Sequence, residues 1–335
     1  MSATEMVDQK DSKTPDEKKS DLTWLGLLVG DYAIDEVIED GRFARIYHGR
    51  AKDGEQRAFK VASTVSAVAG RQTEDTQVLR QITGGFLPAR PDTADLLERE
   101  AKRIKDNAHP NLVQVDAFCA LSLPYYQMEF IEGTTLRQVL QEGRVKLKVF
   151  LDIARAMSQL LRDTSFTYHG DLKPENIIIR HDGSIKFIDP GYFGRLLDES
   201  GNTFTALVTT PMYYPYMKPD DVFALGLIMW EAAFGRNPLA NRISTDEISC
   251  DHVEDDLLKR VQQYEFVGNF NLSALLTIDD PLMARPDLSA ETRAFLLKAV
   301  RMRGGAKLGF DSGFQTMAQL AGALITLQEH GVESF

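Results

Sequence analysis

The sequence predicts an α+β fold in which a small β-rich region comes first and a larger, mainly helical region follows. Residues 32–131 contain short runs rich in β-branched and aromatic residues, which are typical of strands. After Glu132 and Gly133 the runs become longer and their apolar residues recur at helical spacing. Strands that precede helices favour an α+β arrangement over alternating β-α units.

Composition places the chain among ordinary globular proteins, with 43% hydrophobic and 26% charged residues. The net charge of -11 disfavours nucleic acid as a partner, because binding to a phosphate backbone requires clustered Lys and Arg. The two cysteines, Cys119 and Cys250, form no C-x-x-C motif. No run approaches the ~18 apolar residues of a membrane span, and the N-terminus lacks an apolar signal core. We therefore expect no membrane partner and a cytoplasmic location.

The first part of the chain alternates between strand-like and polar segments. Residues 1–21 are polar and without hydrophobic period, which predicts a disordered tail. The runs RIYHGRA and RAFKVAS flank a KDGEQ turn and predict a hairpin, with YAIDEVI as the preceding strand. Ser63 to about Asp95 form a polar insert with Gly84-Gly85 and two prolines, which predicts that the insert includes a mobile surface loop.

A helix is expected over ADLLEREAKRIKD, because Leu96, Leu97, Ala101 and Ile104 recur at helical spacing. Two further strands follow in LVQVDAF and YYQMEFI. The second part of the chain contains five helical runs: TLRQVLQEG, VKLKVFLDIARAMSQLLRDTS, DDVFALGLIMWEAAFG, LSAETRAFLLKAVRMR and FQTMAQLAGALITLQEH.

The strongest chemical signal is a pair of polar motifs on either side of an apolar run. The first motif is Tyr168-His-Gly-Asp-Leu-Lys-Pro-Glu-Asn176 and the second is Ile188-Asp-Pro-Gly191. Together they resemble the catalytic loop and the metal-binding loop of eukaryotic-like (Hanks-type) protein serine/threonine kinases. The resemblance covers about Tyr32 to Leu327 in the family's order of elements and includes Lys60, Glu100 and Asp221 at the start of the large central helix.

The resemblance implies a soluble, bacterial-type member with a bilobal protein kinase-like fold. The N-lobe would be small and β-rich, spanning 22–131 with the insert at about 63–95. The C-lobe would be larger and mainly helical, spanning 132–335. The implied activity is transfer of the γ-phosphoryl group of MgATP to Ser and Thr hydroxyls of protein substrates.

Catalytic roles follow from the same resemblance, for Asp171, Lys173, Lys60, Glu100 and Thr210. Lys60 would hold the α- and β-phosphates and be oriented by Glu100, since a flexible ammonium needs a carboxylate partner. Asp171 would accept the hydrogen bond of the substrate hydroxyl, with Lys173 near the transferring phosphoryl and Thr210 touching Asp171. Asn176 and Asp189 would supply oxygen ligands for Mg²⁺, with Mn²⁺ as a substitute.

The resemblance also implies a nucleotide site formed mostly by apolar side chains. Met128 would be the gatekeeper, and Glu129 to Ile131 the hinge between the lobes. The glycine-rich loop is weak, because Glu39 and Ala44 replace two of its glycines. The implied cofactor-binding residues are Ile38, Gly41, Ile46, Ala58, Lys60, Met128, Glu129, Ile131 and Ile178.

The sequence departs from the family at three further places. Gly170 replaces the arginine that pairs with a phosphorylated loop, so control through that arginine is excluded. Pro190 replaces the phenylalanine of the metal-binding motif, and Tyr213-Tyr-Pro-Tyr216 has no glutamate of the usual A-P-E. We call the segment between Asp189 and Pro215 the activation loop, by its position in the family. A regulatory signal is expected through a partner protein or through the insert.

Two alternatives stay open on the sequence alone. The chain could be a nucleotide-binding pseudokinase scaffold, as Glu39, Pro190 and the missing glutamate suggest. It could also be a small-molecule kinase of the aminoglycoside or choline type, which shares His-Gly-Asp. Lys173-Pro-Glu175, Thr210 and the helix that begins at Asp221 favour protein substrates.

Overall fold

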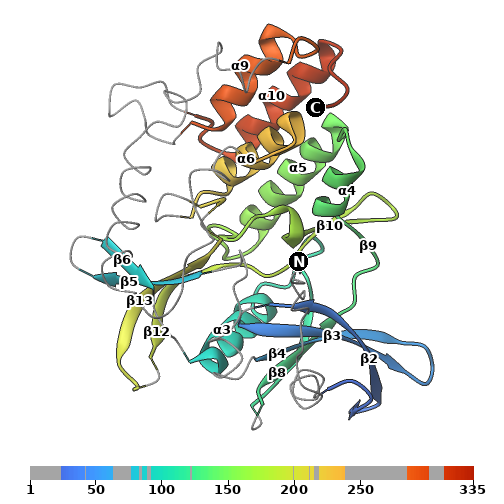
Figure 1. Cartoon of the computed structure of the whole chain (residues 1–335), viewed down its shortest axis with the longest axis vertical. Helices are drawn as coiled ribbons and strands as arrows, with labels where there is room; N and C mark the ends of the chain where they lie inside the picture. The colour runs from blue at the N-terminus through green and yellow to red at the C-terminus, as the bar shows by residue number, and fades with distance from the viewer. Residues whose placement is uncertain are drawn as a thin grey trace, which may run out of the picture.

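A curled antiparallel sheet with one helix forms the N-terminal part of the molecule, and helices form the C-terminal part (Figure 1). The computed structural model describes residues 24–41, 43–62, 77–82, 85–88, 92–120, 123–198, 200–210, 212–214, 219–237, 285–301 and 313–335. The predicted tail over 1–21 and the remainder of the predicted insert lie outside these residues. The predicted succession of strands and helices is confirmed in the described chain.

The N-lobe sheet has six antiparallel strands, and the predicted hairpin is part of it. Arg50 lies opposite Gln56, and Gly54 with φ 93° turns the chain between the two strands. In spatial order the strands are β1 (Leu28–Val29), β2 (Tyr32–Asp40), β3 (Ala44–Ala51), β4 (Gln56–Ala62), β8 (Tyr125–Glu129) and β7 (Val115–Cys119).

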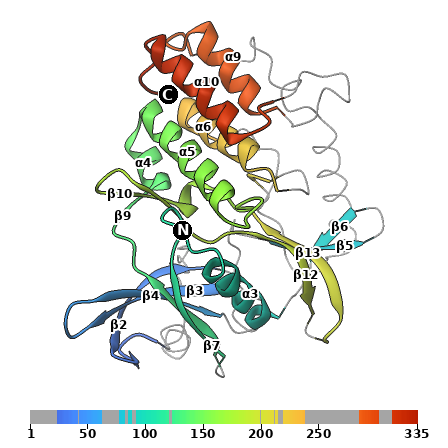
Figure 2. The same ribbon diagram turned by 180° about the vertical axis from the view of Figure 1, so that it is seen from behind.

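Helix α3 (Thr93–Lys105) packs against β7 and β8 on one face of this sheet (Figure 2). The side chain of Asp92 accepts from the Ala94 N–H at 2.8 Å and caps the first turn. Of the predicted apolar face, Leu97, Ala101 and Ile104 are buried. Glu100 and Arg103 of the same helix line the cleft described below.

The C-lobe is built around α6 (Asp221–Phe234), in which Phe223 and Trp230 are almost fully buried. The C-terminal Phe335 packs its ring on Phe150 and Phe295, which closes the core. The other helices are α4 (Leu136–Glu142), α5 (Leu147–Asp163), the 3₁₀ turn η1 (Pro174–Asn176), α9 (Ala290–Ala299) and α10 (Met317–Glu329). None of the described helices is long and apolar enough to cross a bilayer.

A small sheet joins the lobes to the two motif loops. Its strands are β9 (Gly133–Thr135), β10 (Ile177–Arg180) and β11 (Ile185–Phe187), with β10 in the centre. Strand β10 follows the first motif and β11 precedes the second, so their antiparallel pairing brings both motifs to one end of the sheet.

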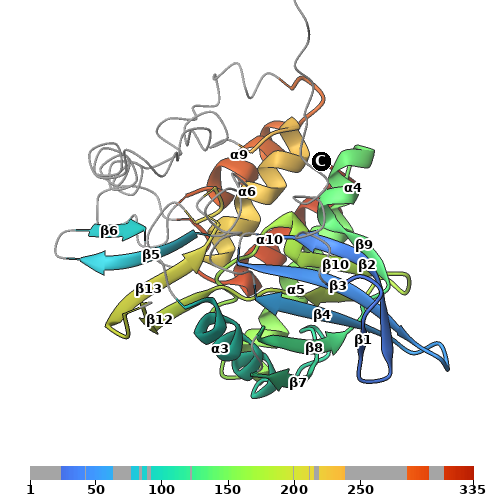
Figure 3. The same ribbon diagram turned by 60° about the horizontal axis from the view of Figure 1, so that its bottom comes forward.

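A third sheet was not expected from the sequence (Figure 3). It contains β12 (Tyr192–Leu197) and β13 (Thr203–Thr209) of the activation loop, followed by β5 (Gln77–Ile82) and β6 (Gly85–Pro88) of the insert. Residues 77–82 and 85–88 of the insert therefore form strands that were not predicted, and α3 already begins at Thr93. The reason is that β5 finds its backbone partners in β13, far along the chain, where local turn signals carry no information.

We expect Gly226→Ala in the middle of α6 to lower the free energy of unfolding by about 1–3 kcal/mol, because a methyl group there meets the main chain of Ala299 in α9. Gly322→Ala in α10 is the matched control, since its surroundings are open and it lies on an exposed helix face. The free energy of unfolding of Gly322→Ala should rise by about 0.5–1 kcal/mol, because alanine is favoured over glycine in a helix. Urea unfolding followed by circular dichroism measures both, and equal stability of the two variants would contradict this packing.

Candidate active site

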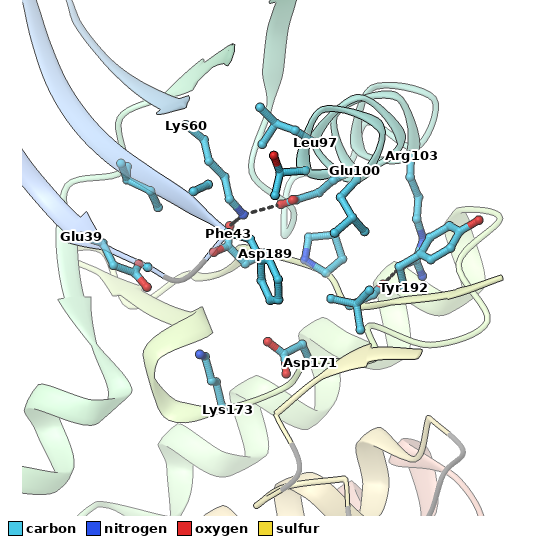
Figure 4. Close-up of a pocket in the computed structure, with 18 residues that line it drawn as sticks. Glu39, Phe43, Lys60, Leu97, Glu100, Arg103, Asp171, Lys173, Asp189 and Tyr192 are labelled. Carbon is cyan, nitrogen blue, oxygen red and sulfur yellow. Dashed lines mark hydrogen bonds and ion pairs between the residues drawn. The ribbon is translucent and has the colours of Figure 1, made fainter. Parts of the chain in front are cut away.

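A cleft lies between the N-lobe sheet, α3 and the motif loops (Figure 4). Predicted site residues from both lobes line it, namely Gly41, Ile46, Lys60, Glu100, Asp171, Lys173 and Asp189. Apolar side chains close the side nearest α3 and the activation loop: Phe43, Leu96, Leu97, Tyr192 and Val208. The fold thus brings together, in one cleft, predicted site residues that are up to 148 positions apart in the sequence.

Lys60 lies at the centre of a buried charge cluster. Its Nζ is 2.8 Å from Glu100 Oε1 and 3.0 Å from Asp189 Oδ1. The Tyr126 hydroxyl donates to the same Glu100 oxygen at 2.8 Å. Strand β4, helix α3 and the loop that carries Asp189 are therefore fixed to one another through a single ammonium group.

Charge and burial act in opposite directions on this cluster. Burial alone would lower the pKa of Lys60, but the carboxylates of Asp189 and Glu100 outweigh it and raise that pKa well above its usual value. Burial raises the pKa of Glu100, against the opposing effect of the Lys60 ammonium. Lys60 therefore stays protonated, which is the state that can bind a polyanion.

The Asp171 carboxylate is held from two sides. Its Oδ1 accepts from the Thr210 backbone N–H at 2.6 Å, and its Oδ2 accepts from Asn176 Nδ2 at 3.2 Å. Asn176 Nδ2 also donates to the Asp171 main-chain oxygen at 2.8 Å. The side chain of Lys173, in the same loop, is buried and lines the cleft with Asp171.

Asp221, the first residue of α6, supports the loop from beneath. Its carboxylate accepts from the backbone N–H groups of His169 at 2.7 Å and Gly170 at 2.9 Å, and from the Tyr214 hydroxyl at 2.6 Å. Gly170 has φ 87°, and a side chain there would meet the Tyr168 ring. Glycine adopts this backbone conformation without strain, whereas a larger residue would not.

Asp189 is the one non-glycine residue with positive φ, 52°, in the part of the chain that the structure describes. Its Oδ1 is buried and accepts no hydrogen bond among those residues, Lys60 being its charged neighbour. Asn176 turns its amide nitrogen to protein acceptors, and Nδ2 is 3.4 Å from the Asp189 main-chain oxygen. A carboxylate and an amide oxygen therefore fit a hard cation that takes its other ligands from phosphates and water.

Of the predicted adenine-side residues, Ile46 lines the cleft, whereas the others lie outside its lining: Ile38, Ala58, Met128, Glu129, Ile131 and Ile178. Ala58 and Met128 pair across β4 and β8 and are buried, whereas Ile38 on β2 is 45% exposed. The Glu129 carboxylate forms an ion pair with Lys186 and accepts from the Gln114 N–H at 2.8 Å. Ile131 and Ile178 are half-buried. A nucleotide-binding role for these residues remains a prediction.

Arg103 and Tyr126 are site residues that the sequence interpretation missed. Arg103 lines the cleft one helical turn after Glu100, and that i, i+3 spacing is the signal that could have identified it. Tyr126 lies two residues before Met128 on β8, so strand alternation places both on one face. Neither signal identifies the function of the side chain.

Arg137 of α4 anchors the end of the activation loop. Its Nε is 2.6 Å from Glu175 Oε1, its Nη1 is 2.5 Å from Glu231 Oε1, and its Nη2 is 2.8 Å from the Tyr213 hydroxyl. That hydroxyl in turn donates to Glu231 Oε2 at 2.8 Å. The network joins the activation loop to α4, α6 and the catalytic loop. The Pro215-Tyr216 part of the predicted departure from A-P-E lies outside the described residues.

The two-lobed fold around a buried lysine, a helix glutamate and two loop aspartates defines the protein kinase class. The family model "Protein kinase domain" matches residues 32–312, and the chain belongs to this family. A solved structure of the Mycobacterium tuberculosis PknI kinase domain shares the fold, with a TM-score of 0.51 and 15% identity over 90% of this chain and 98% of that one.

Two curated relatives show the range of similar proteins. A probable serine/threonine-protein kinase of Streptomyces coelicolor is 26% identical over 68% of this chain and 34% of its own length. The tyrosine-protein kinase MasK of Myxococcus xanthus is 29% identical over 72% of this chain and 37% of its own length. The matched region thus spans about a third of each of these relatives.

Burial lowers the pKa of His169, whose Nε2 is 3.0 Å from the Ile188 carbonyl oxygen and whose Nδ1 faces the Asp171 N–H. In the unfolded chain the His169 imidazole takes up a proton near pH 6.5, whereas in the folded chain it does so only at lower pH. The contribution of the neutral His169 imidazole to the free energy of unfolding is therefore complete above about pH 6.5. Below that pH the contribution decreases, by up to about 1.4 kcal/mol per pH unit.

The measurement is the free energy of unfolding at pH 7.5, 6.5 and 5.5 in the wild type and in His169→Gln. The variant should lose less stability between the two lower values. His181→Gln removes an exposed histidine and should leave the wild-type pH dependence unchanged. Identical pH profiles for all three proteins would show that His169 is not the group responsible.

Proposed function

We propose that this chain is an ATP-dependent protein serine/threonine kinase that transfers the γ-phosphoryl group of MgATP to protein hydroxyls. The observation that carries the proposal is the convergence of Lys60, Glu100 and Asp189, at 2.8 and 3.0 Å, in the cleft that also holds Asp171. Phosphoryl transfer demands positioning and charge neutralisation more than covalent chemistry, and this cluster supplies both.

Each polar residue has a role that its surroundings support. The protonated Lys60 binds the α- and β-phosphates. Glu100 holds the Lys60 ammonium in position, and Tyr126 holds Glu100. Asp171, fixed by Thr210 and Asn176, accepts the hydrogen bond of the substrate hydroxyl and then its proton. Asn176 and Asp189 hold Mg²⁺, or Mn²⁺ in its place. The metal, when bound, neutralises phosphate charge.

The choice of serine and threonine over tyrosine rests on Lys173, two residues after Asp171. Its buried side chain shares the cleft with the carboxylate, which supports a role beside the transferring phosphoryl. The same cleft supports a kinase over a pseudokinase, because it holds the Lys60–Glu100–Asp189 cluster together with Asp171. Gly170 leaves regulation to a partner protein or to the insert.

Asp171→Asn is expected to reduce labelling of a generic protein substrate by about 10²–10⁴-fold, because the amide cannot accept the hydroxyl proton. The substitution keeps the shape of the side chain, so the thermal melt should change little. Asp106→Asn is the control, since that carboxylate is exposed and pairs with Lys102 outside the cleft.

The assay measures transfer of label from radiolabelled ATP in the presence of Mg²⁺, with an EDTA control. The substrates tested are serine, threonine and tyrosine peptides, and, separately, aminoglycosides or choline. Labelling of serine or threonine peptides that disappears with EDTA and with Asp171→Asn supports the proposal. Equal labelling by Asp171→Asn would reveal a contaminating kinase. Labelling confined to tyrosine or to small molecules would overturn the proposed substrate class.

Glu39 provides a second test, because its side chain lines the cleft where the family has a glycine. A carboxylate close to a triphosphate weakens binding, so Glu39→Gln should lower the KM for ATP about two- to fivefold while kcat stays similar. The effect should shrink at high ionic strength, because salt screens exposed charges. An unchanged KM at low salt would show that Glu39 points away from the bound nucleotide.

A further inference from the structure

Arg103 reaches from α3 to both motif loops at once. Its Nη2 donates to the Tyr168 main-chain oxygen at 2.8 Å, and its Nη1 donates to the main-chain oxygen of Gly191. Figure 4 shows its side chain descending from the helix that carries Glu100, toward the loop that carries Tyr192. Tyr168 comes three residues before Asp171, and Gly191 comes two residues after Asp189.

One guanidinium group therefore connects the helix of Glu100, the loop of Asp171 and the loop of Asp189. We propose that Arg103 is a positioning residue that holds these three elements in register for phosphoryl transfer. The inference rests on the proposed function and adds a residue that acts through Glu100, Asp171 and Asp189 instead of touching the reacting groups.

The surroundings of Arg103 fit this role better than a general role in stability. The guanidinium lies 4.2 Å from the Phe166 ring centroid and 5.1 Å from that of Tyr168. Both hydrogen-bond acceptors are uncharged carbonyl oxygens, and burial lowers the Arg103 pKa. Burying a cation on neutral acceptors is costly, and an apolar side chain would fill the same space at less cost.

The two carbonyl groups also mark the place where the loops touch. A methyl group on Gly191 would collide with the Gly170 main-chain oxygen, so the two backbones are in direct contact there. The planar guanidinium group of Arg103 bridges this contact, because its two terminal nitrogens each donate to one of the two carbonyl oxygens. A lysine at this position has a single nitrogen and cannot reproduce that geometry.

Loss of the guanidinium group and its two hydrogen bonds would allow α3 and the loops to shift relative to each other. The Lys60–Glu100 and Lys60–Asp189 pairs would then be formed in a smaller fraction of molecules. The turnover number falls with that fraction, even where the protein is fully folded. A residue needed for stability alone would lower the melting temperature and leave kcat at low temperature unchanged.

The experiment compares Arg103→Met, Arg103→Lys and the control Lys102→Met, which removes an exposed cation from the same helix. At 15 °C and saturating MgATP, we expect kcat of Arg103→Met to fall about tenfold to hundredfold, which corresponds to the value of one charge-assisted hydrogen bond. Arg103→Lys should lose less, and Lys102→Met should stay within about twofold of the wild type.

Hydrogen exchange of the protein without nucleotide or metal gives a second, independent readout. Peptides that cover 165–171 and 187–193 should exchange faster in Arg103→Met and at the wild-type rate in Lys102→Met. Unchanged exchange and unchanged kcat in a folded Arg103→Met protein would overturn the proposal. So would an equal loss of kcat in Lys102→Met.

The two proposals can fail separately. If the wild type transfers no phosphate, the proposed function fails, and the exchange rates alone decide the role of Arg103. If Arg103→Met does not fold, Arg103→Lys decides it, because this variant keeps the charge and the length of the side chain. Wild-type kcat and exchange in a folded Arg103→Lys would then show that the guanidinium group is not required.

Discussion

The buried pairing of the Lys60 ammonium with two carboxylates is the interaction on which the arrangement of this kinase domain depends. A strand, a helix and a loop from distant parts of the chain each contribute one charged group. Because an unpaired charge in the interior is costly, displacement of any one of these elements would destabilise the other two charged groups. The Tyr126 hydroxyl extends this dependence to the neighbouring strand.

Beneath that cluster, the polar loops rest on an apolar helix. Helix α6 is buried along most of its length, yet its first residue, Asp221, offers a carboxylate to two backbone N–H groups of the catalytic loop. The loop therefore obtains its hydrogen bonds from a rigid element whose position hydrophobic packing determines. Rigid support of this kind keeps the Asp171 carboxylate in one orientation without help from a phosphorylated side chain.

The sequence predicted the order of elements and the polar residues of the cleft, because Lys60, Asp171 and Asp189 stand in motifs with a fixed order and spacing. It did not reveal Arg103 or Arg137, since long cationic side chains on amphipathic helices look the same whether they face solvent or cross a lobe. The pairing of the insert with the activation loop was also hidden, because strand partners far apart in sequence leave no local pattern. The adenine-side residues and the domain boundaries remain predictions.

The pairing of β5 with β13 links the insert to the loop that holds Asp171. Residues 77–80 pair along the main chain with residues 206–209, and the next residue, Thr210, donates its N–H to the Asp171 carboxylate. A rearrangement of the activation loop therefore has to displace β5 or break these main-chain hydrogen bonds. The cost of moving the loop thus depends on a segment that lies outside both motifs.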